Sequence, residues 1–106
     1  MKKFAQKAYE KNQQSTNRES FQRLIATYNI AIEAGIRRDQ DRAKHALALL
    51  ESTVDPEPNP ELALSLRSIY ADCSSHLDDG NFAAFTESME RLKGLWLAYE
   101  KLFSNA

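Results

Sequence analysis

This sequence has few of the residues that break, kink or crosslink a chain. It contains one cysteine, Cys73, with three glycines and three prolines in 106 residues. A single cysteine excludes an internal disulfide framework and fits a reducing compartment. No run approaches the ~18 apolar residues that a membrane span needs, and Gln6, Lys7 and Glu10 interrupt any signal-peptide core. We therefore expect a cytoplasmic protein with no membrane partner.

A strong charge of either sign is also missing. The formal net charge is -1 and the isoelectric point is about 6.1. Basic residues gather in two stretches, from Lys2 to Lys11 and from Arg37 to Lys44. Because the chain as a whole is slightly acidic, these stretches are better explained as solvated faces than as a nucleic-acid footprint. We expect no nucleic-acid partner.

The apolar residues favour helices, because they recur at helical spacing and no stretch alternates as a half-buried strand would. Hydrophobic residues make up 42% of the chain and charged residues 27%, which is typical of a folded domain. The four expected stripes are Phe21, Leu24, Ile25, Tyr28, Ala31 and Ile32; Ala43, Ala46, Leu47, Leu50 and Val54; Leu62, Leu66, Ile69, Tyr70, Cys73 and Leu77; and Phe82, Phe85, Met89, Leu92, Trp96, Tyr99 and Phe103.

Capping residues predict where these helices begin and end. A short, weak first helix over residues 1–14 is expected to stop at the polar break Gln13-Gln14-Ser15, and Thr16 with Glu19 forms a capping box for the next helix. We expect that helix to stop at Gly35. The remaining helix starts are predicted at Asp39, at Asn59-Pro60-Glu61 and at Asn81, which follows Gly80.

All three prolines fall between Pro56 and Pro60, so residues 55–60 are expected to form a stiff, extended connector. Short loops make sequential helices antiparallel neighbours. The fold class is therefore all-α: an antiparallel four-helix bundle of two helical hairpins plus a short N-terminal helix, in one domain over 1–106. Whether residues 1–14 dock on the bundle stays open, as does whether Gly94 permits close packing.

Catalytic, metal-binding and cofactor-binding residues are not expected. Cys73 and His76 stand one turn apart, but Cys73 lies in the centre of an apolar stripe, where thiols are unreactive. His45 and His76 are too far apart in sequence, with one cysteine, to suggest a zinc site. No phosphate loop, nucleophile elbow or calcium loop is present. The sequence thus predicts a protein that is not an enzyme.

Several apolar residues fall off the main stripes and give the one pointer to function. Such residues indicate either a wider core or a groove that accepts an amphipathic helix. Both alternatives stay open from the sequence. The off-stripe residues are Ile30, with Ala26 and Ala34 on the same helix, and Leu49, Leu64, Leu95 and Leu102.

Several short motifs follow one another along the chain: Ala8-Tyr9, Thr16, Tyr28-Asn29-Ile30-Ala31-Ile32, Ser52-Thr53-Val54-Asp55, Ile69-Tyr70, Leu77, Gly80-Asn81, Phe85, Met89, Leu92 and Leu95. This layout resembles the flagellin-export chaperone family, which has an Ala-Tyr segment followed by four antiparallel helices. The resemblance implies a secretion chaperone that binds the helical C-terminal region of flagellin and prevents premature polymerisation.

The same resemblance implies roles for particular residues. Phe4 to Tyr9 would cover part of the client surface, and the off-stripe residues would line the groove. The alternative that the sequence leaves open is a small self-associating bundle, a homodimer with a structural or regulatory adaptor role.

Overall fold

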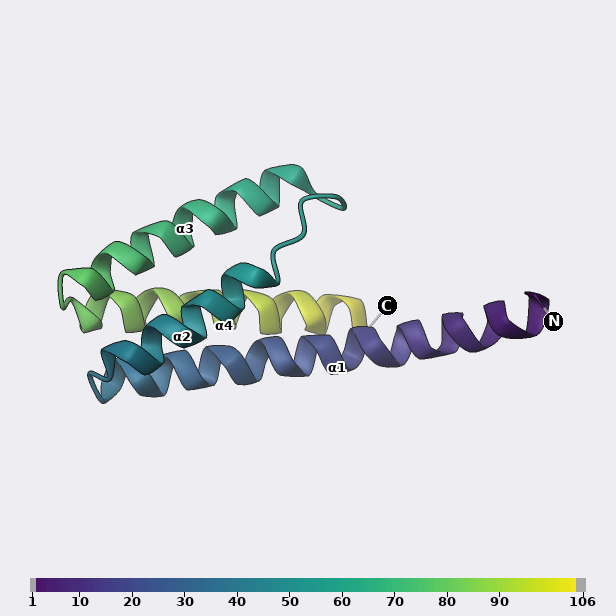
Figure 1. Cartoon of the computed structure of the whole chain (residues 1–106), viewed down its shortest axis with the longest axis horizontal. Helices are drawn as coiled ribbons and strands as arrows, with labels where there is room; N and C mark the ends of the chain where they lie inside the picture. The colour runs from purple at the N-terminus through teal and green to yellow at the C-terminus, as the bar shows by residue number, and fades with distance from the viewer. Residues whose placement is uncertain (1, 105–106) are drawn as a thin grey trace.

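The computed structural model describes the backbone of residues 2–104 and the side chains of residues 18–102. Within that backbone the chain forms four α-helices and no strand, which confirms the all-α prediction (Figure 1). The helices are α1 (Lys2–Ile36), α2 (Gln40–Ser52), α3 (Pro60–Asp78) and α4 (Phe82–Ser104).

The four helices pack in a ring. α1 packs against α2 and α4, and α3 packs against the same two helices, so α1 and α3 lie on a diagonal. Consecutive helices run antiparallel (Figure 1). The predicted bundle of two helical hairpins, α1–α2 and α3–α4, is therefore confirmed. We call the end of the bundle that holds the turns at 37–39 and 79–81 the turn end. An apolar cleft opens at the opposite end, which we call the cleft end.

α1 corrects one prediction. It is uninterrupted from Lys2 to Ile36, so the separate helix over residues 1–14, the break at 13–15 and the Thr16–Glu19 cap are wrong. The sequence holds no proline and no glycine before Gly35. Glutamine is a good helix former, so the polar stretch lowers apolar content without stopping the helix. The beginning of α1 extends past the cleft end of the bundle (Figure 1).

The two turns share one geometry, in which a residue with positive φ precedes the cap of the next helix. At the second turn Gly80 has φ of 73° and the Asn81 side chain accepts a hydrogen bond from the Ala84 N–H at 3.2 Å, as predicted. At the first turn Arg38 takes the left-handed position with φ of 58°, and Asp39 caps α2 as predicted. Both turns thus close a helix with a Schellman-type motif.

Gly35 therefore has a different role from the predicted stop. It is buried inside α1, and a Cβ at this position would lie 3.1 Å from Phe85 Cδ1 and collide with Thr86 Oγ1. The absence of a side chain permits the close approach of α1 and α4. Gly94 shows the contrasting case, since nothing lies within 4 Å of a Cβ added there.

The proline-rich connector between the hairpins is non-helical, as predicted, but it is not extended. Residues 56–58 form a turn, which the Glu57 N–H stabilises by donating to Asp55 Oδ1 at 3.0 Å. Asn59 then caps α3 by accepting from the Leu62 N–H at 3.1 Å, and Pro60 is the first helical residue. Asp55 favours this turn because its short side chain can accept a hydrogen bond from the backbone N–H two residues later.

Most residues of the predicted stripes are buried or partly buried in the core. Leu62 and Tyr99 are exceptions, because both are exposed. The side chain of Phe103 lies outside the described residues. Ala34, expected on the back of its helix, is buried. Small residues dominate near the turn end of the first hairpin. The buried apolar residues are Tyr28, Ala31, Ala34, Ala43, Ala46, Leu47, Leu50, Ala63, Leu66, Tyr70, Cys73, Leu77, Phe85, Met89 and Leu92.

Candidate functional site

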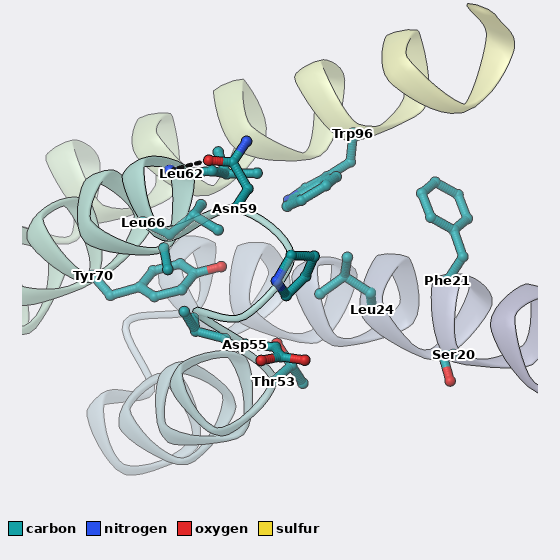
Figure 2. A pocket seen from close by; sticks show the side chains of 13 residues that line it. Ser20, Phe21, Leu24, Thr53, Asp55, Asn59, Leu62, Leu66, Tyr70 and Trp96 are labelled. Carbon is teal, nitrogen blue, oxygen red and sulfur yellow. Dashed lines mark hydrogen bonds between the residues drawn. The ribbon is translucent and has the colours of Figure 1, made fainter. Parts of the chain in front are cut away.

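An apolar cleft of about 510 Å³, open to solvent, lies at the cleft end. It forms where α3 diverges from the other helices toward its own N-terminus (Figures 1 and 2). Four parts of the chain contribute to its lining: α1, the proline-rich connector, α3 and α4. The lining residues are Ser20, Phe21, Leu24, Thr53, Val54, Asp55, Pro58, Asn59, Leu62, Ala63, Leu66, Tyr70 and Trp96.

The cleft shape follows from local sequence. Pro58 and Asn59 prevent α2 from running directly into α3, so the connector separates the two helices at this end. The small side chains of the alanines near the turn end allow the helices to pack closely there. Leu24, Leu66 and Trp96, which line the cleft, have larger side chains. The bundle is therefore narrow at the turn end and open at the cleft end.

Three aromatic side chains form a hydrogen-bonded group at the base of the cleft. The Trp96 Nε1–H donates to Tyr28 Oη at 3.0 Å, and Tyr28 Oη lies 2.6 Å from Tyr70 Oη. Tyr70 and Trp96 line the cleft, and Tyr28 is completely buried behind them. This group connects α1, α3 and α4, so it fixes the positions of three of the cleft's four walls.

The base of the cleft carries no charge. Burial raises the pKa of Tyr28 and of Tyr70, and for Tyr70 the hydrogen bond with Tyr28 adds to this effect. Both phenols therefore stay protonated well above neutral pH. A ligand at this surface meets apolar side chains and neutral hydroxyl groups.

Three polar side chains, Thr53, Asp55 and Asn59, line the connector side of the cleft, and Ser20 lines the α1 side. Asp55 accepts from the Glu57 N–H and Asn59 accepts from the Leu62 N–H. The chain here is acidic: Asp55 lines the cleft, and Glu57 and Glu61 are the sequence neighbours of the lining residues Pro58 and Leu62. No Lys or Arg occurs between Lys44 and Arg67. We call Asp55, Glu57 and Glu61 the acidic wall. Among the described side chains, none forms an ion pair with these three carboxylates.

The five described off-stripe residues are all exposed, with exposed fractions between 39% and 73%. They do not widen the core of this chain, and they do not line the cleft. Their binding role stays a prediction. The five are Ile30, Leu49, Leu64, Leu95 and Leu102. The side chains of Phe4 and Tyr9 lie outside the described residues.

Seven of the cleft residues belong to the predicted core stripes because of their spacing, namely Phe21, Leu24, Val54, Leu62, Leu66, Tyr70 and Trp96. Periodicity identifies the inward face of a helix, but it does not show that the bundle opens at one end. The signal available in the sequence was the position of Leu62, which is the first residue of its stripe and follows the proline-rich connector directly.

Cys73 is completely buried, and burial raises the pKa of its thiol. Across the described side chains, no group of three or more His, Cys, Asp and Glu residues is arranged to hold a metal ion. None of the helices in the described part of the chain is both long and apolar enough to cross a membrane.

Comparisons with protein-family models, with curated proteins and with solved structures each find no match to this chain.

Proposed function

We propose that this protein is a non-enzymatic chaperone or adaptor that holds an amphipathic helix of another protein in the apolar cleft. The observation that carries the proposal is the open cleft of about 510 Å³ with its uncharged base. The resemblance of the sequence to flagellin-export chaperones supplies the client to test first, the helical C-terminal region of flagellin.

A helix suits this cleft better than a small polar ligand does. Small-molecule sites place a few polar groups so that they converge on the ligand. Here Asn59 and Asp55 already accept hydrogen bonds from the backbone, and Tyr28 is engaged with Tyr70 and Trp96. What remains available is apolar surface on several helices, which accepts the side chains at positions i, i+3, i+4 and i+7 of a docked helix.

The helices that border the cleft carry further apolar surface. Leu64 on α3 and Leu95 and Leu102 on α4 are exposed in the isolated chain. Each such side chain contributes roughly 1.5–3 kcal/mol when a partner covers it fully. A client that folds as it binds spends part of this free energy on ordering, which leaves a complex that can release its cargo.

The test measures binding of a flagellin C-terminal fragment by calorimetry and by the fluorescence of Trp96, the single tryptophan. Leu62→Glu changes a cleft residue that is 44% exposed, and Leu97→Glu changes a residue outside the cleft lining that is 41% exposed. We expect Leu62→Glu to weaken binding at least ~10-fold, about 1.4 kcal/mol, and Leu97→Glu to leave it within ~2-fold.

Two results would contradict the proposal. Absence of a complex at protein concentrations of tens of micromolar would remove flagellin as the client, since such a complex would be weaker than about -6 to -7 kcal/mol. Equal weakening by both substitutions would show that the fragment binds outside the cleft. Thermal melting of both variants controls for loss of the fold.

A further inference from the structure

The beginning of α1 leaves the bundle beside the cleft. Ser20, Phe21 and Leu24 form the α1 wall of the cleft, and the preceding part of the same helix continues beyond the other helices (Figure 1). No other helix of the chain runs alongside the start of α1 in this view. A helix that projects into solvent in this way has little tertiary packing to stabilise it.

The sequence of this projecting part is complementary to the cleft. Between residues 2 and 11 it has four lysines and one glutamate, whereas the acidic wall consists of Asp55 in the cleft lining and Glu57 and Glu61 next to lining residues in sequence. It also has apolar residues at helical spacing, which match an apolar cleft. The lysines are Lys2, Lys3, Lys7 and Lys11, and the apolar residues are Phe4, Ala5, Ala8 and Tyr9.

The same chain cannot bring this segment into its own cleft without breaking α1. The helix runs uninterrupted through Ser20 and Phe21, so the residues before them point away from the cleft along the helix axis. A return would need a bend of the chain, and no proline or glycine precedes Gly35 to favour one. The occupant must therefore come from another molecule.

We propose that the occupant is the start of α1 from a second copy of this chain. Two antiparallel α1 helices, related by a twofold axis, each place the Phe4–Tyr9 segment in the partner's cleft and the lysines against the partner's acidic wall. A twofold arrangement uses the same contact twice and closes on itself. This assembly differs from the cover that the family resemblance implies, which belongs to the same chain as the surface it covers.

The dimer goes beyond the proposed function and does not depend on it. If a client also uses the cleft, client and second copy compete for one surface, and each weakens the binding of the other. The self-association test below needs no client. Its failure would leave client binding untouched, and client binding can be measured separately on any variant that is monomeric.

Charge reversal tests the proposal on the full chain by sedimentation equilibrium. We expect wild type to have twice the 12.1 kDa chain mass at concentrations on the order of 100 µM. One variant carries Lys3→Glu with Lys7→Glu, and a second carries Glu57→Lys with Glu61→Lys. Each alone should dissociate at least ~10-fold more easily, because like charges then face each other across the contact.

An equimolar mixture of the two variants should restore the dimer, since both reciprocal contacts then join opposite charges. Reversing two exposed acids away from the cleft, Asp72→Lys with Glu90→Lys, is the matched control and should leave the dimer unchanged. Circular dichroism confirms that all variants fold. A monomeric wild type, a dimer that survives both reversals, or a mixture that stays monomeric would each overturn the proposal.

Discussion

Tyr28 and Tyr70 lie on diagonally opposed helices, and their hydroxyl oxygens are 2.6 Å apart. Two rings that reach across the bundle in this way determine its width at that level. The Trp96 N–H bond to Tyr28 extends the same connection to α4. The base of the cleft is therefore held by polar contacts inside an otherwise apolar core, and the predictions below begin there.

Tyr70→Phe should lower the free energy of unfolding by about 1–2 kcal/mol, because Tyr28 loses a buried hydrogen-bond partner. Tyr28→Phe should cost more, since it leaves the Trp96 N–H and the Tyr70 hydroxyl without their partner. Urea unfolding of both single variants and of the double variant measures the coupling, which we expect at about 0.5–3 kcal/mol. Additive effects would mean that the two hydroxyls do not interact.

Stability should fall at alkaline pH. Burial raises the pKa of Tyr28, Tyr70 and Cys73 in the folded chain, so the unfolded chain loses these protons first as the pH rises. The unfolded state then binds fewer protons than the folded state, and each group lowers the unfolding free energy by about 1.4 kcal/mol per pH unit. The loss begins near the ordinary pKa of about 8.5 for the thiol and about 10 for the phenols.

Urea titrations between neutral pH and pH of about 11 measure this decline. Tyr70→Phe is the control, because it removes one of the titrating groups and should make the decline less steep above pH of about 10. A free energy of unfolding that stays constant over this range would contradict the raised pKa values.

The two helical glycines should respond to alanine in opposite ways. Gly35→Ala introduces a Cβ that collides with Thr86 Oγ1 and crowds Phe85, so we expect a loss of about 1–3 kcal/mol. Gly94→Ala adds a Cβ in open space within a helix, so we expect a gain of up to about 1 kcal/mol. Thermal melting of the pair checks this, and a stabilising Gly35→Ala would show that α1 and α4 are not in close contact.

Cys73 should react slowly with thiol reagents in the folded protein. The side chain is completely buried and burial raises its thiol pKa, so both access and thiolate fraction are low. We expect labelling by Ellman's reagent at pH of about 8 to be at least ~100-fold slower than in urea, with a rate set by opening of the structure. Rapid labelling of the native state would contradict the burial of Cys73.

The sequence predicted the fold well because its helix signals are local. Asp39, Asn59 and Asn81 cap their helices as their residue types suggest, and Gly80 adopts the left-handed conformation. Gly35 placed the end of α1 within one residue, since the helix ends at Ile36, but the left-handed turn position falls on Arg38. Glycine serves helix ends and close contacts alike. Only the neighbouring helix decides between these roles, and here Thr86 lies against it.

The cleft could not be predicted in the same way. Phe21, Leu66 and Trp96 have the spacing of core residues, and spacing does not reveal whether the opposite helix lies close or diverges. The divergence of α3 depends on the turn at residues 56–58, which the proline pattern suggested would be extended. The off-stripe leucines were identified by sequence, but the structure was needed to show that they are exposed and do not line the cleft.

Because the bundle is narrow at the turn end and open at the cleft end, we expect the cleft end to unfold locally before the turn end does. At the turn end, Gln40 Nε2 donates to the Leu77 carbonyl at 2.7 Å, and Lys44 pairs with Asp78 at 3.0 Å, so the two hairpins are joined there. At the cleft end the first turns of α3 have neighbours on fewer sides. Amide hydrogens near Leu62 should therefore exchange by local fraying, and those near Leu77 only with global unfolding. We therefore expect the mouth of the cleft near Leu62 to change width while the base, held by Tyr28, Tyr70 and Trp96, stays in place.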